Sequence, residues 1–429
     1  MIAIPKDKSI DLLKKLSFPR PTGSNNEILA QKIIINELKK LKYQVKLEKV
    51  KYIKSKIIRK IETVARYQII LWLTIISTFL HPLIIVFLFS LYFYSKFYFY
   101  PKIQLKLAKG ITYNLIANYV SNKNYRNNKK IVLCAHYDTA KIRNESMQKR
   151  FKLYSNIFDF TDFLTYSFIV LLFFTGITNI SFTKSFSWQD GLLSFNSLII
   201  ESMWLFFIFY FCIINLLFIY FILSNKNRYS SGANDNASGV YVLLKIAEAV
   251  KKMKFNINID FNFFAAEEIG YYGCRNWIKS HISKLEKSKT YFINVDTVGK
   301  GNALFINKGI GHVVKHYSNN FLIDTLKECA TEIGFKTENF WGVFGDDSKL
   351  LEENLQACGI ITSYPRKNSI ISTLLNKLFL MPADIAIPFF DYIHNINDEY
   401  SNINKKNINK TIKLLLQSIE IIQKQLDSR

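Results

Sequence analysis

One polar turn, and the ionisable residues able to meet it, constrain the fold of this chain more than any other feature. The stretch SGANDNASG at 231–239 offers a single carboxylate, Asp235, on a tight turn. Other ionisable residues end apolar, strand-like runs: His136 and Asp138 follow 131–135, Glu267 and Glu268 follow 261–266, Asp296 follows 291–295, and His394 lies near the C-terminus. Active sites of open α/β sheets lie at the carboxyl ends of parallel strands. The pattern therefore predicts that these side chains meet at one edge of a sheet.

Strand and helix patterns alternate around that predicted edge. Ser24 and Glu27 form an S-x-x-E capping box, which predicts a helix ending near Lys42. Apolar periodicity predicts further helices at 240–253, 273–285, 321–334 and 406–426, and strands at 43–52, 112–120, 257–264, 290–295 and 359–363. From residue 230 onward this is the pattern of an α/β domain.

Three long uncharged runs interrupt the domain pattern, at 67–95, 163–183 and 202–225. A helix rises ~1.5 Å per residue and the hydrocarbon core is ~30 Å thick, so runs of this length predict membrane spans. The pair His81-Pro82 breaks the first run, which leaves a hairpin, a re-entrant segment and a single kinked span open. Buried core helices are the alternative to membrane insertion.

Charge distribution points to a membrane surface as partner and to one orientation. Lys and Arg outnumber Asp and Glu by 57 to 33, a net charge of +24. Basic residues crowd the flanks of the apolar runs at 51–66, 141–152 and 226–228, whereas Lys184 stands alone on the opposite side. No nucleic-acid motif accompanies them, so an anionic inner leaflet is predicted and nucleic acid is not. The positive-inside rule then predicts a multi-pass plasma-membrane protein with a cytoplasmic catalytic domain.

Cysteine usage and the N-terminus agree with a reducing, cytosol-facing compartment. The five cysteines are scattered without CxxC spacing, so neither a disulfide framework nor a cysteine zinc site is expected. Residues 1–16 contain no apolar core of a signal peptide, and no cleavable leader is expected.

The ionisable residues indicate a functional site only when they are considered together. By itself, His136 could be a hydrogen-bonded core histidine, and an acidic pair such as Glu267-Glu268 is usually a solvated helix start. An ionised side chain at the end of a buried strand is costly unless it binds a cation, so the combined pattern predicts a metal centre.

The pieces AHYD, SGANDNASGV, FFAAEEIGYYG, INVDTVG and IHNIND together resemble the co-catalytic dizinc aminopeptidases, a family that includes bacterial leucyl-type aminopeptidases and glutamate carboxypeptidase II. PRPTGS at 19–24 matches more loosely. The resemblance implies a mixed, mostly parallel sheet flanked by helices, in which the peptidase domain comprises residues 1–66, 101–154 and 226–429. Transmembrane hairpins would be inserted at 67–100 and 155–225.

The resemblance also implies a role for each site residue and two Zn²⁺ per chain. Asp235 would bridge the ions, His136 and Asp296 would complete one site, and Glu268 and His394 the other. Glu267 would be the general base acting on a metal-bridged hydroxide, and Asp138 would orient His136. Such a centre hydrolyses N-terminal residues from peptide substrates.

Alternatives remain for the last metal ligand, for the group that stabilises the oxyanion, and for the function. His312 and His316 compete with His394, and Tyr364 is a candidate oxyanion donor. The same scaffold also supports a single-zinc glutaminyl cyclase-like transferase or a non-enzymatic membrane receptor. The choice between amino- and carboxypeptidase, the physiological metal, the preferred side chain and the oligomeric state stay open.

Overall fold

The computed structural model describes residues 10–54, 109–121, 130–142, 228–253, 255–311, 315–342, 345–367, 385–386 and 393–427. The chain divides into two compact units, of which the first comprises residues 1–52, 110–156 and 226–429. The second, residues 53–109 and 157–225, lies almost wholly outside the described residues. The fold below is that of the first unit, and the domain boundaries expected at 66/67, 100/101, 154/155 and 225/226 stay predictions.

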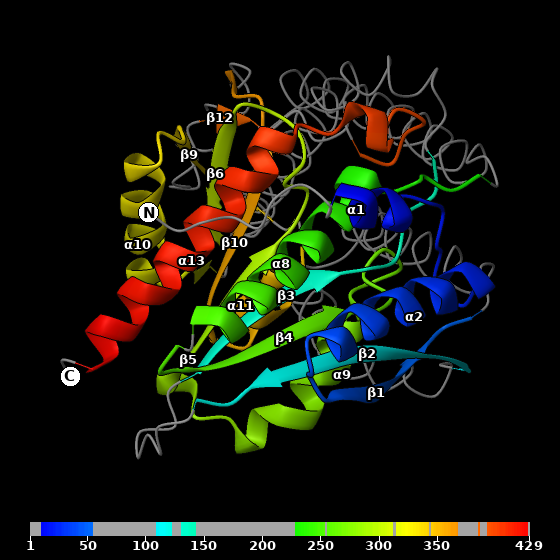
Figure 1. The fold of residues 1–429 in the computed structure, drawn as a ribbon, viewed down its shortest axis with the longest axis horizontal. Helices are drawn as coiled ribbons and strands as arrows, with labels where there is room; N and C mark the ends of the chain where they lie inside the picture. The colour runs from blue at the N-terminus through cyan, green and yellow to red at the C-terminus, as the bar shows by residue number, and fades with distance from the viewer. Residues whose placement is uncertain are drawn as a thin grey trace, which may run out of the picture. The chain divides into compact units, whose positions relative to one another are not determined.

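An eight-stranded mixed sheet forms the centre of this unit (Figure 1). Its order is β1-β2-β4-β3-β5-β10-β6-β9. The strands are β1 Val45–Tyr52, β2 Gly110–Tyr119, β3 Lys130–His136, β4 Asn258–Phe264, β5 Thr290–Val295, β6 Ala303–Asn307, β9 Thr337–Phe340 and β10 Gln356–Ser363. Strands β4, β3, β5 and β10 run parallel to one another, so the residues that follow β3, β4 and β5 emerge at the same edge.

The central strands are apolar because both faces of the sheet are covered. Every residue of β3 from Ile131 to His136 is buried, as is all of β5. A parallel sheet with helices on both sides requires such continuous apolar runs, and this is why the sequence revealed these strands. The antiparallel edge pair β1 and β2 instead alternates between buried and exposed positions.

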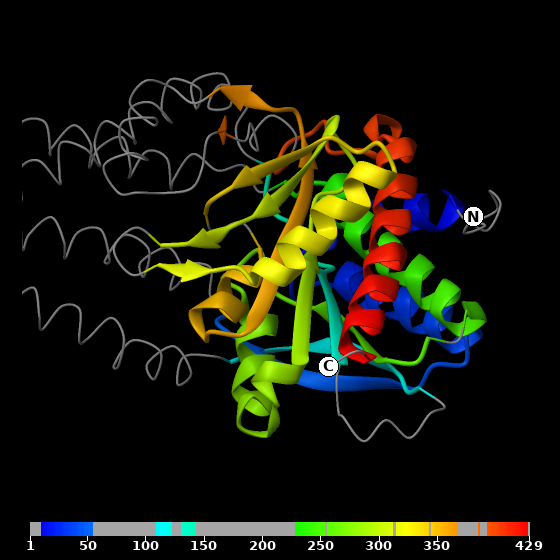
Figure 2. The same cartoon turned by 90° about the vertical axis from the view of Figure 1, so that its left-hand side faces the viewer.

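Helices pack on the two faces of the sheet (Figures 1 and 2). On one face, α9 and α11 supply Trp277 and Leu350 to a core cluster with Phe292 of β5. On the other, α8, α13 and α10 pack against the sheet and each other, with α2 beside α8. The helices are α1 Ile10–Leu16, α2 Asn25–Lys40, α8 Ser238–Met253, α9 Tyr272–His281, α10 Asn320–Glu332, α11 Asp347–Glu352 and α13 Lys405–Asp427.

Short elements complete the described part. They are the pairs β7 Gly309–Ile310 with β8 His316–Tyr317 and β11 Arg366–Lys367 with β12 Ile385–Ala386, the π-helical turn η2 Ala233–Ala237, and the 3₁₀ turns η3 Ile282–Lys284, η4 Lys287–Lys289 and η6 Tyr400–Asn402. The N-cap predicted for α2 forms, because the side chain of Ser24 accepts the amide of Glu27, but the carboxylate of Glu27 accepts the amide of Gly23 instead of that of Ser24.

The predicted mixed α/β class with a mostly parallel, helix-flanked sheet is confirmed. The transmembrane hairpins predicted at 67–100 and 155–225 fall outside the described residues. In the part of the chain that the structure describes, no helix combines the length and the apolar surface that a membrane crossing needs.

Candidate metal centre

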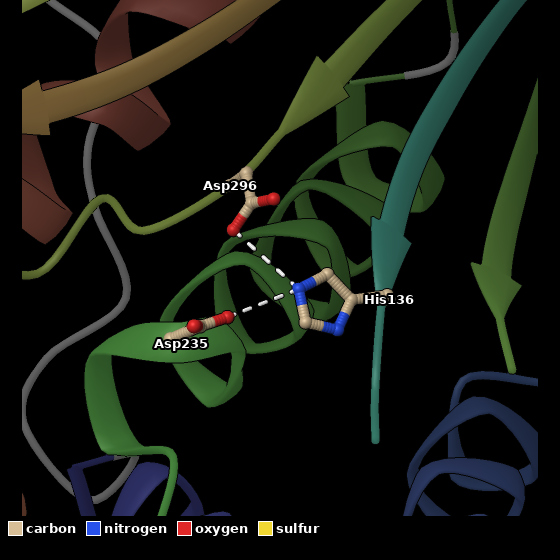
Figure 3. Close-up of side chains that lie close together, drawn as sticks. All are labelled: His136, Asp235 and Asp296. Carbon is tan, nitrogen blue, oxygen red and sulfur yellow. Dashed lines mark ion pairs between the residues drawn. The ribbon is translucent and has the colours of Figure 1, made fainter. Parts of the chain in front are cut away.

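His136, the last residue of β3, lies at the middle of a buried group of carboxylates. Its Nε2 atom is 3.1 Å from Oδ1 of Asp235 and 3.6 Å from Oδ1 of Asp296, which directly follows β5 (Figure 3). Oε2 of Glu267 lies 4.0 Å from the same nitrogen. The parallel pairing of β3 with β4 and β5 places His136 beside the ends of the strands that lead to Glu267 and Asp296, whereas Asp235 comes from the turn η2.

His394 forms a second group on the other side of Asp235. Its Nε2 atom is 3.1 Å from Oδ2 of Asp235 and 3.2 Å from Oε2 of Glu268. The two oxygens of Asp235 therefore face two different histidines. This carboxylate, 5% exposed, is the element common to both groups.

The turn that carries Asp235 is fixed by its two asparagine neighbours. Asn236 accepts the amides of Gly239 and Thr297 and donates to the carbonyl of Val295 at the end of β5. Asn234 accepts the amide of Gly299. The Asn-Asp-Asn sequence thus points the central carboxylate into the site while the flanking amides bind the loop that follows Asp296.

Asp138 holds the neighbouring backbone in place but belongs to neither of the two groups of residues around His136 and His394. Its carboxylate accepts the backbone amides of Glu267, at 3.0 Å, and Glu268, at 3.3 Å, and the hydroxyl of Thr22 at 2.8 Å. Oδ1 also lies 3.6 Å from Nδ1 of His136, the ring nitrogen that faces away from Asp235. Asp138 therefore links the end of β3 to the loop carrying the two glutamates.

Burial shifts the pKa values of these groups strongly. Burial raises the pKa of Glu267, Glu268 and Asp296. The pKa of His394 is about 9, since burial, which lowers it, is outweighed by Glu268 and Asp235. Hydrogen bonds from both histidines overcome burial and lower the pKa of Asp235. The buried carboxylates of the site outnumber the positively charged groups beside them, so their negative charge is not balanced by the protein.

The chemistry of these side chains fits metal ions. Potential ligand atoms lie within 4.8 Å of one another in three groups: His136, Asp235 and Asp296; Asp235, Glu268 and His394; and His136, Glu267 and Glu268. Oδ1 of Asp296, Oε1 of Glu268 and Nδ1 of His136 are buried without hydrogen-bond partners. Within the described ranges these carboxylates form ion pairs with histidine alone, so divalent cations would supply the missing charge.

The rival candidates lie elsewhere or are not described. His316 belongs to β8, where Nδ1 is 3.3 Å from Oδ1 of Asn354, and it joins none of the three groups. His312 lies outside the described residues. Tyr364 is 42% exposed just after β10, and nothing tests its role as an oxyanion donor.

Three buried residues near the site were not predicted. Asp398 contacts the Asp235 turn, Arg20 donates to the carbonyls of Tyr137 and Ser231, and Asp346 precedes α11 with both carboxylate oxygens buried and lacking hydrogen-bond partners. Burial and the neighbouring carboxylates Asp296 and Asp138 raise the pKa of Asp346 well above its usual range. The loosely matching PRPTGS piece contains Arg20 and the IHNIND piece contains Asp398, whereas the GDDS stretch gave no signal for Asp346.

Comparisons with known proteins match residues 221–419 to peptidase family M28. Aminopeptidase YwaD of Bacillus subtilis is 34% identical over 113 residues, 25% of this chain and 23% of the relative. Leucine aminopeptidase 2 of Arthroderma otae is 25% identical over 181 residues, 41% of this chain and 35% of the relative. The chain thus spans a quarter to a third of the length of these curated relatives.

Solved structures share the fold at low sequence identity. A Zn-dependent exopeptidase from Parabacteroides distasonis matches with a TM-score of 0.50 and 14% identity, covering 97% of this chain and 99% of that one. A glutaminyl cyclase from Porphyromonas gingivalis matches with a TM-score of 0.53 and 13% identity, covering 98% and 99%. At such identities the matches show the fold alone.

These findings overturn the localisation predicted from the sequence. The match to the Zn-dependent exopeptidase covers 97% of this chain and 99% of that chain. The prediction of an integral, multi-pass plasma-membrane protein with a cytoplasmic catalytic domain is therefore wrong. Its physical weakness is that counting basic flanks assigns an orientation only once spans exist, and a lysine-rich α/β domain produces the same flanks. The predicted contact with an anionic inner leaflet rested on those spans.

Proposed function

We propose that this chain, whose residues 221–419 match peptidase family M28, is a zinc-dependent metallopeptidase that removes N-terminal residues from peptides at a two-metal centre. The observation that carries the proposal is the position of Asp235. Its two oxygens each lie 3.1 Å from a different histidine, as a carboxylate shared by two ions requires.

The ligand assignment follows the two groups. His136 and Asp296 would hold one ion with Oδ1 of Asp235, and Glu268 and His394 would hold the other with Oδ2. Three protein ligands per ion, drawn from histidine and carboxylate, are typical of catalytic zinc sites that leave a position open. Bound zinc supplies Lewis acidity toward the scissile carbonyl and the attacking water.

Glu267 is the proposed general base. It lies beside the ligand Glu268 but outside the two groups that share Asp235, and burial raises its pKa. A carboxylate with a raised pKa accepts a proton readily. Glu267 takes a proton from the attacking water as the water oxygen bonds to the carbonyl carbon. It returns the proton to the leaving nitrogen as the C–N bond breaks.

Asp138 is the proposed positioning residue for this step. Because it accepts the backbone amides of both Glu267 and Glu268, it fixes the base relative to the neighbouring ligand. It also stands beside Nδ1 of His136, where a carboxylate holds the ring in the tautomer that leaves Nε2 free for the metal.

A glutaminyl cyclase-like transferase with a single zinc is the alternative, because a glutaminyl cyclase shares the fold. Two complete ligand groups favour two ions and hydrolysis. A non-enzymatic receptor is less favoured, since such a protein has no need to keep both groups.

The test is to assay the full chain against matched peptides with free and blocked N-termini, and against N-terminal glutaminyl peptides, while measuring zinc per chain. Two zinc ions and cleavage that requires a free N-terminus are expected. Loss of activity with a chelator and its return with added zinc should accompany them. One zinc ion with cyclisation of glutaminyl peptides would replace the proposal with its alternative.

A further inference from the structure

We propose that Arg20 is a positioning residue whose guanidinium holds together the two loops that carry His136 and Asp235, and thereby sets the affinity of the metal centre. The inference rests on the proposed function only for the identity of the site as a metal centre. Arg20 lies between α1 and α2, distant in sequence from both loops, and is fully buried.

The guanidinium reaches both loops through their backbone carbonyls. Nε donates to the carbonyl of Tyr137, between His136 and Asp138, at 2.6 Å. Nη1 donates to the carbonyl of Ser231 and Nη2 to that of Gly232, each at 2.9 Å. One planar group thus joins the end of β3 to the turn leading into Asp235.

Arg20 is itself held by its own segment. Nη1 also donates to the carbonyls of Leu16, at 2.7 Å, and Phe18, at 3.0 Å, and the backbone amide of Arg20 donates to Oγ1 of Thr139 at 2.9 Å. All three guanidinium nitrogens therefore donate. Since an unpaired buried charge is strongly unfavourable, these bonds are needed to keep Arg20 inside.

The acceptors explain why the residue is arginine. Five backbone carbonyls accept from Nε, Nη1 and Nη2, and the five N–H groups of a guanidinium can serve them whereas the three of a lysine ammonium cannot. Burial lowers the pKa of Arg20 to about 10, which leaves it charged at neutral pH. The carboxylates that raise the pKa of Arg20 against burial, Asp398, Asp138, Asp235 and Glu268, are those in and around the metal centre.

Close packing transmits the position of Arg20 to Asp235. Gly232 adopts the left-handed conformation at φ +60°, and a Cβ there would lie 2.3 Å from Cγ2 of Thr139, 2.5 Å from the carbonyl oxygen of Asp235 and 3.2 Å from Nη1 of Arg20. The turn is thus pressed between Arg20 and the chain after Asp138. A side chain larger than glycine at this position would collide with the packing on both sides.

Arg20 also lies beside a pairing between residues 140–142 and 228–230. The amide of Ser230 donates to the carbonyl of Ala140, and the amide of Ile142 to that of Arg228. Arg20 binds the chain immediately before this pairing, at Tyr137, and immediately after it, at Ser231 and Gly232. The Arg20 bonds therefore hold together the two segments of chain on either side of this pairing.

The test is the zinc affinity of Arg20→Ala and Arg20→Lys in the full chain, measured by competition with a chromophoric chelator. Loss of a residue that orients metal ligands typically weakens metal binding by about 10–100-fold, and we expect this loss for both variants. Guanidinium at a non-denaturing concentration should restore zinc binding to Arg20→Ala, whereas the neutral isostere urea should not. Wild-type zinc affinity in Arg20→Lys would overturn the proposal, and this holds even if Arg20→Ala fails to fold.

Ile34→Val and Leu38→Ala are the matched controls, because both side chains are fully buried in α2 and contact neither loop through hydrogen bonds. They should lower thermal stability while leaving zinc affinity unchanged and insensitive to guanidinium. If they weaken zinc binding as much as Arg20→Lys at equal loss of stability, Arg20 has only a general structural role. Because the readout is zinc binding, a failure to hydrolyse peptides would count against the proposed function and not against this inference.

Discussion

Asp398 accepts the backbone amide of Asn234 at 2.6 Å, although the two residues are far apart in sequence. The same carboxylate accepts the amide of Asp235 at 3.3 Å, and the hydroxyl of Ser230 donates to it at 3.3 Å. Asp398 follows His394 by one short turn. The contact therefore sets the distance between His394 and the carboxylate of Asp235 that it faces.

Replacing Asp398 by Ala should loosen that turn and weaken the group formed by Asp235, Glu268 and His394. Two amides would lose their acceptor inside the protein, a cost of about 1–3 kcal/mol for each buried group left unsatisfied. We expect a lower unfolding temperature and weaker binding of one zinc ion. Asp398→Asn keeps one acceptor oxygen and should fall between wild type and Asp398→Ala. Equal zinc affinities in all three proteins would show that Asp398 has no part in placing His394.

The central strands were predictable because their burial requires a sequence pattern that is visible in the chain. β3, β4 and β5 are buried on both faces, which requires unbroken apolar runs. β9, TENF, lies at the edge and is only partly buried, and α11 has six residues beginning with an aspartate. Neither segment contains enough repeats of an apolar pattern to be distinguished from a loop in the sequence.

The same contrast holds in the site. His136, Asp296 and the two glutamates were predicted as site residues because an ionisable residue at or just beyond the end of a buried strand is unusual. Arg20 was missed because its partners are backbone carbonyls of distant residues, which leave no side-chain pattern. Asp346 was missed because tertiary packing alone carries the start of α11 into the core. Which loops lie next to each other in the folded protein cannot be predicted from local sequence patterns, and the roles of Arg20 and Asp346 depend on it.

The base can be separated from the ligands by changing one glutamate at a time. Glu267→Gln should retain both zinc ions and lose about 10²–10⁴-fold in turnover, the usual contribution of general acid–base catalysis. Glu268→Gln is the matched control, because the neighbouring side chain should lose zinc instead. Turnover and zinc content measured on the same samples distinguish the two outcomes. An unchanged turnover in Glu267→Gln would remove it from the role of base.

Asp235 and His394 should differ in how many ions they affect. Asp235→Asn changes the residue shared by both groups and should weaken both ions, whereas His394→Ala should mainly empty one. Zinc titration with resolved binding steps is the measurement. Two ions held at wild-type affinity in Asp235→Asn would refute the bridging assignment.

The last prediction concerns pH and stability, away from the metal centre. Nε2 of His281 at the end of α9 lies 3.1 Å from Oε1 of Glu48 on β1, and its Nδ1 lies 2.8 Å from the carbonyl of Trp277. Both ring nitrogens face acceptors, so the fold favours the doubly protonated imidazolium. The hydrogen bond to Glu48, opposed by partial burial, raises the pKa of His281 above 6.5. Burial, which raises the pKa of Glu48, is outweighed by His281 and Lys46, which lower it below 4.5.

The directions of the pKa shifts of His281 and Glu48 define the pH range in which the pair stabilises the fold most. The raised pKa of His281 gives stability that is complete below pH 6.5 and is lost as pH rises through the folded-state value. The lowered pKa of Glu48 gives stability that is complete above pH 4.5 and is lost as pH falls through its folded-state value. The pair therefore stabilises the α9 to β1 contact most between pH 4.5 and 6.5. Since both groups are partly exposed, the effect should be about 1 kcal/mol or less.

Urea unfolding of wild type and His281→Gln between about pH 5 and 9 measures this effect, because the range brackets the titration of the histidine. The difference in unfolding free energy between the two proteins should shrink as pH rises, because wild type loses the imidazolium that the variant never has. Glu48→Gln should show the same reduced dependence, since it removes the acceptor that holds the proton. A difference between wild type and His281→Gln that stays constant across this range would mean that His281 is already neutral in the folded protein at its acidic end.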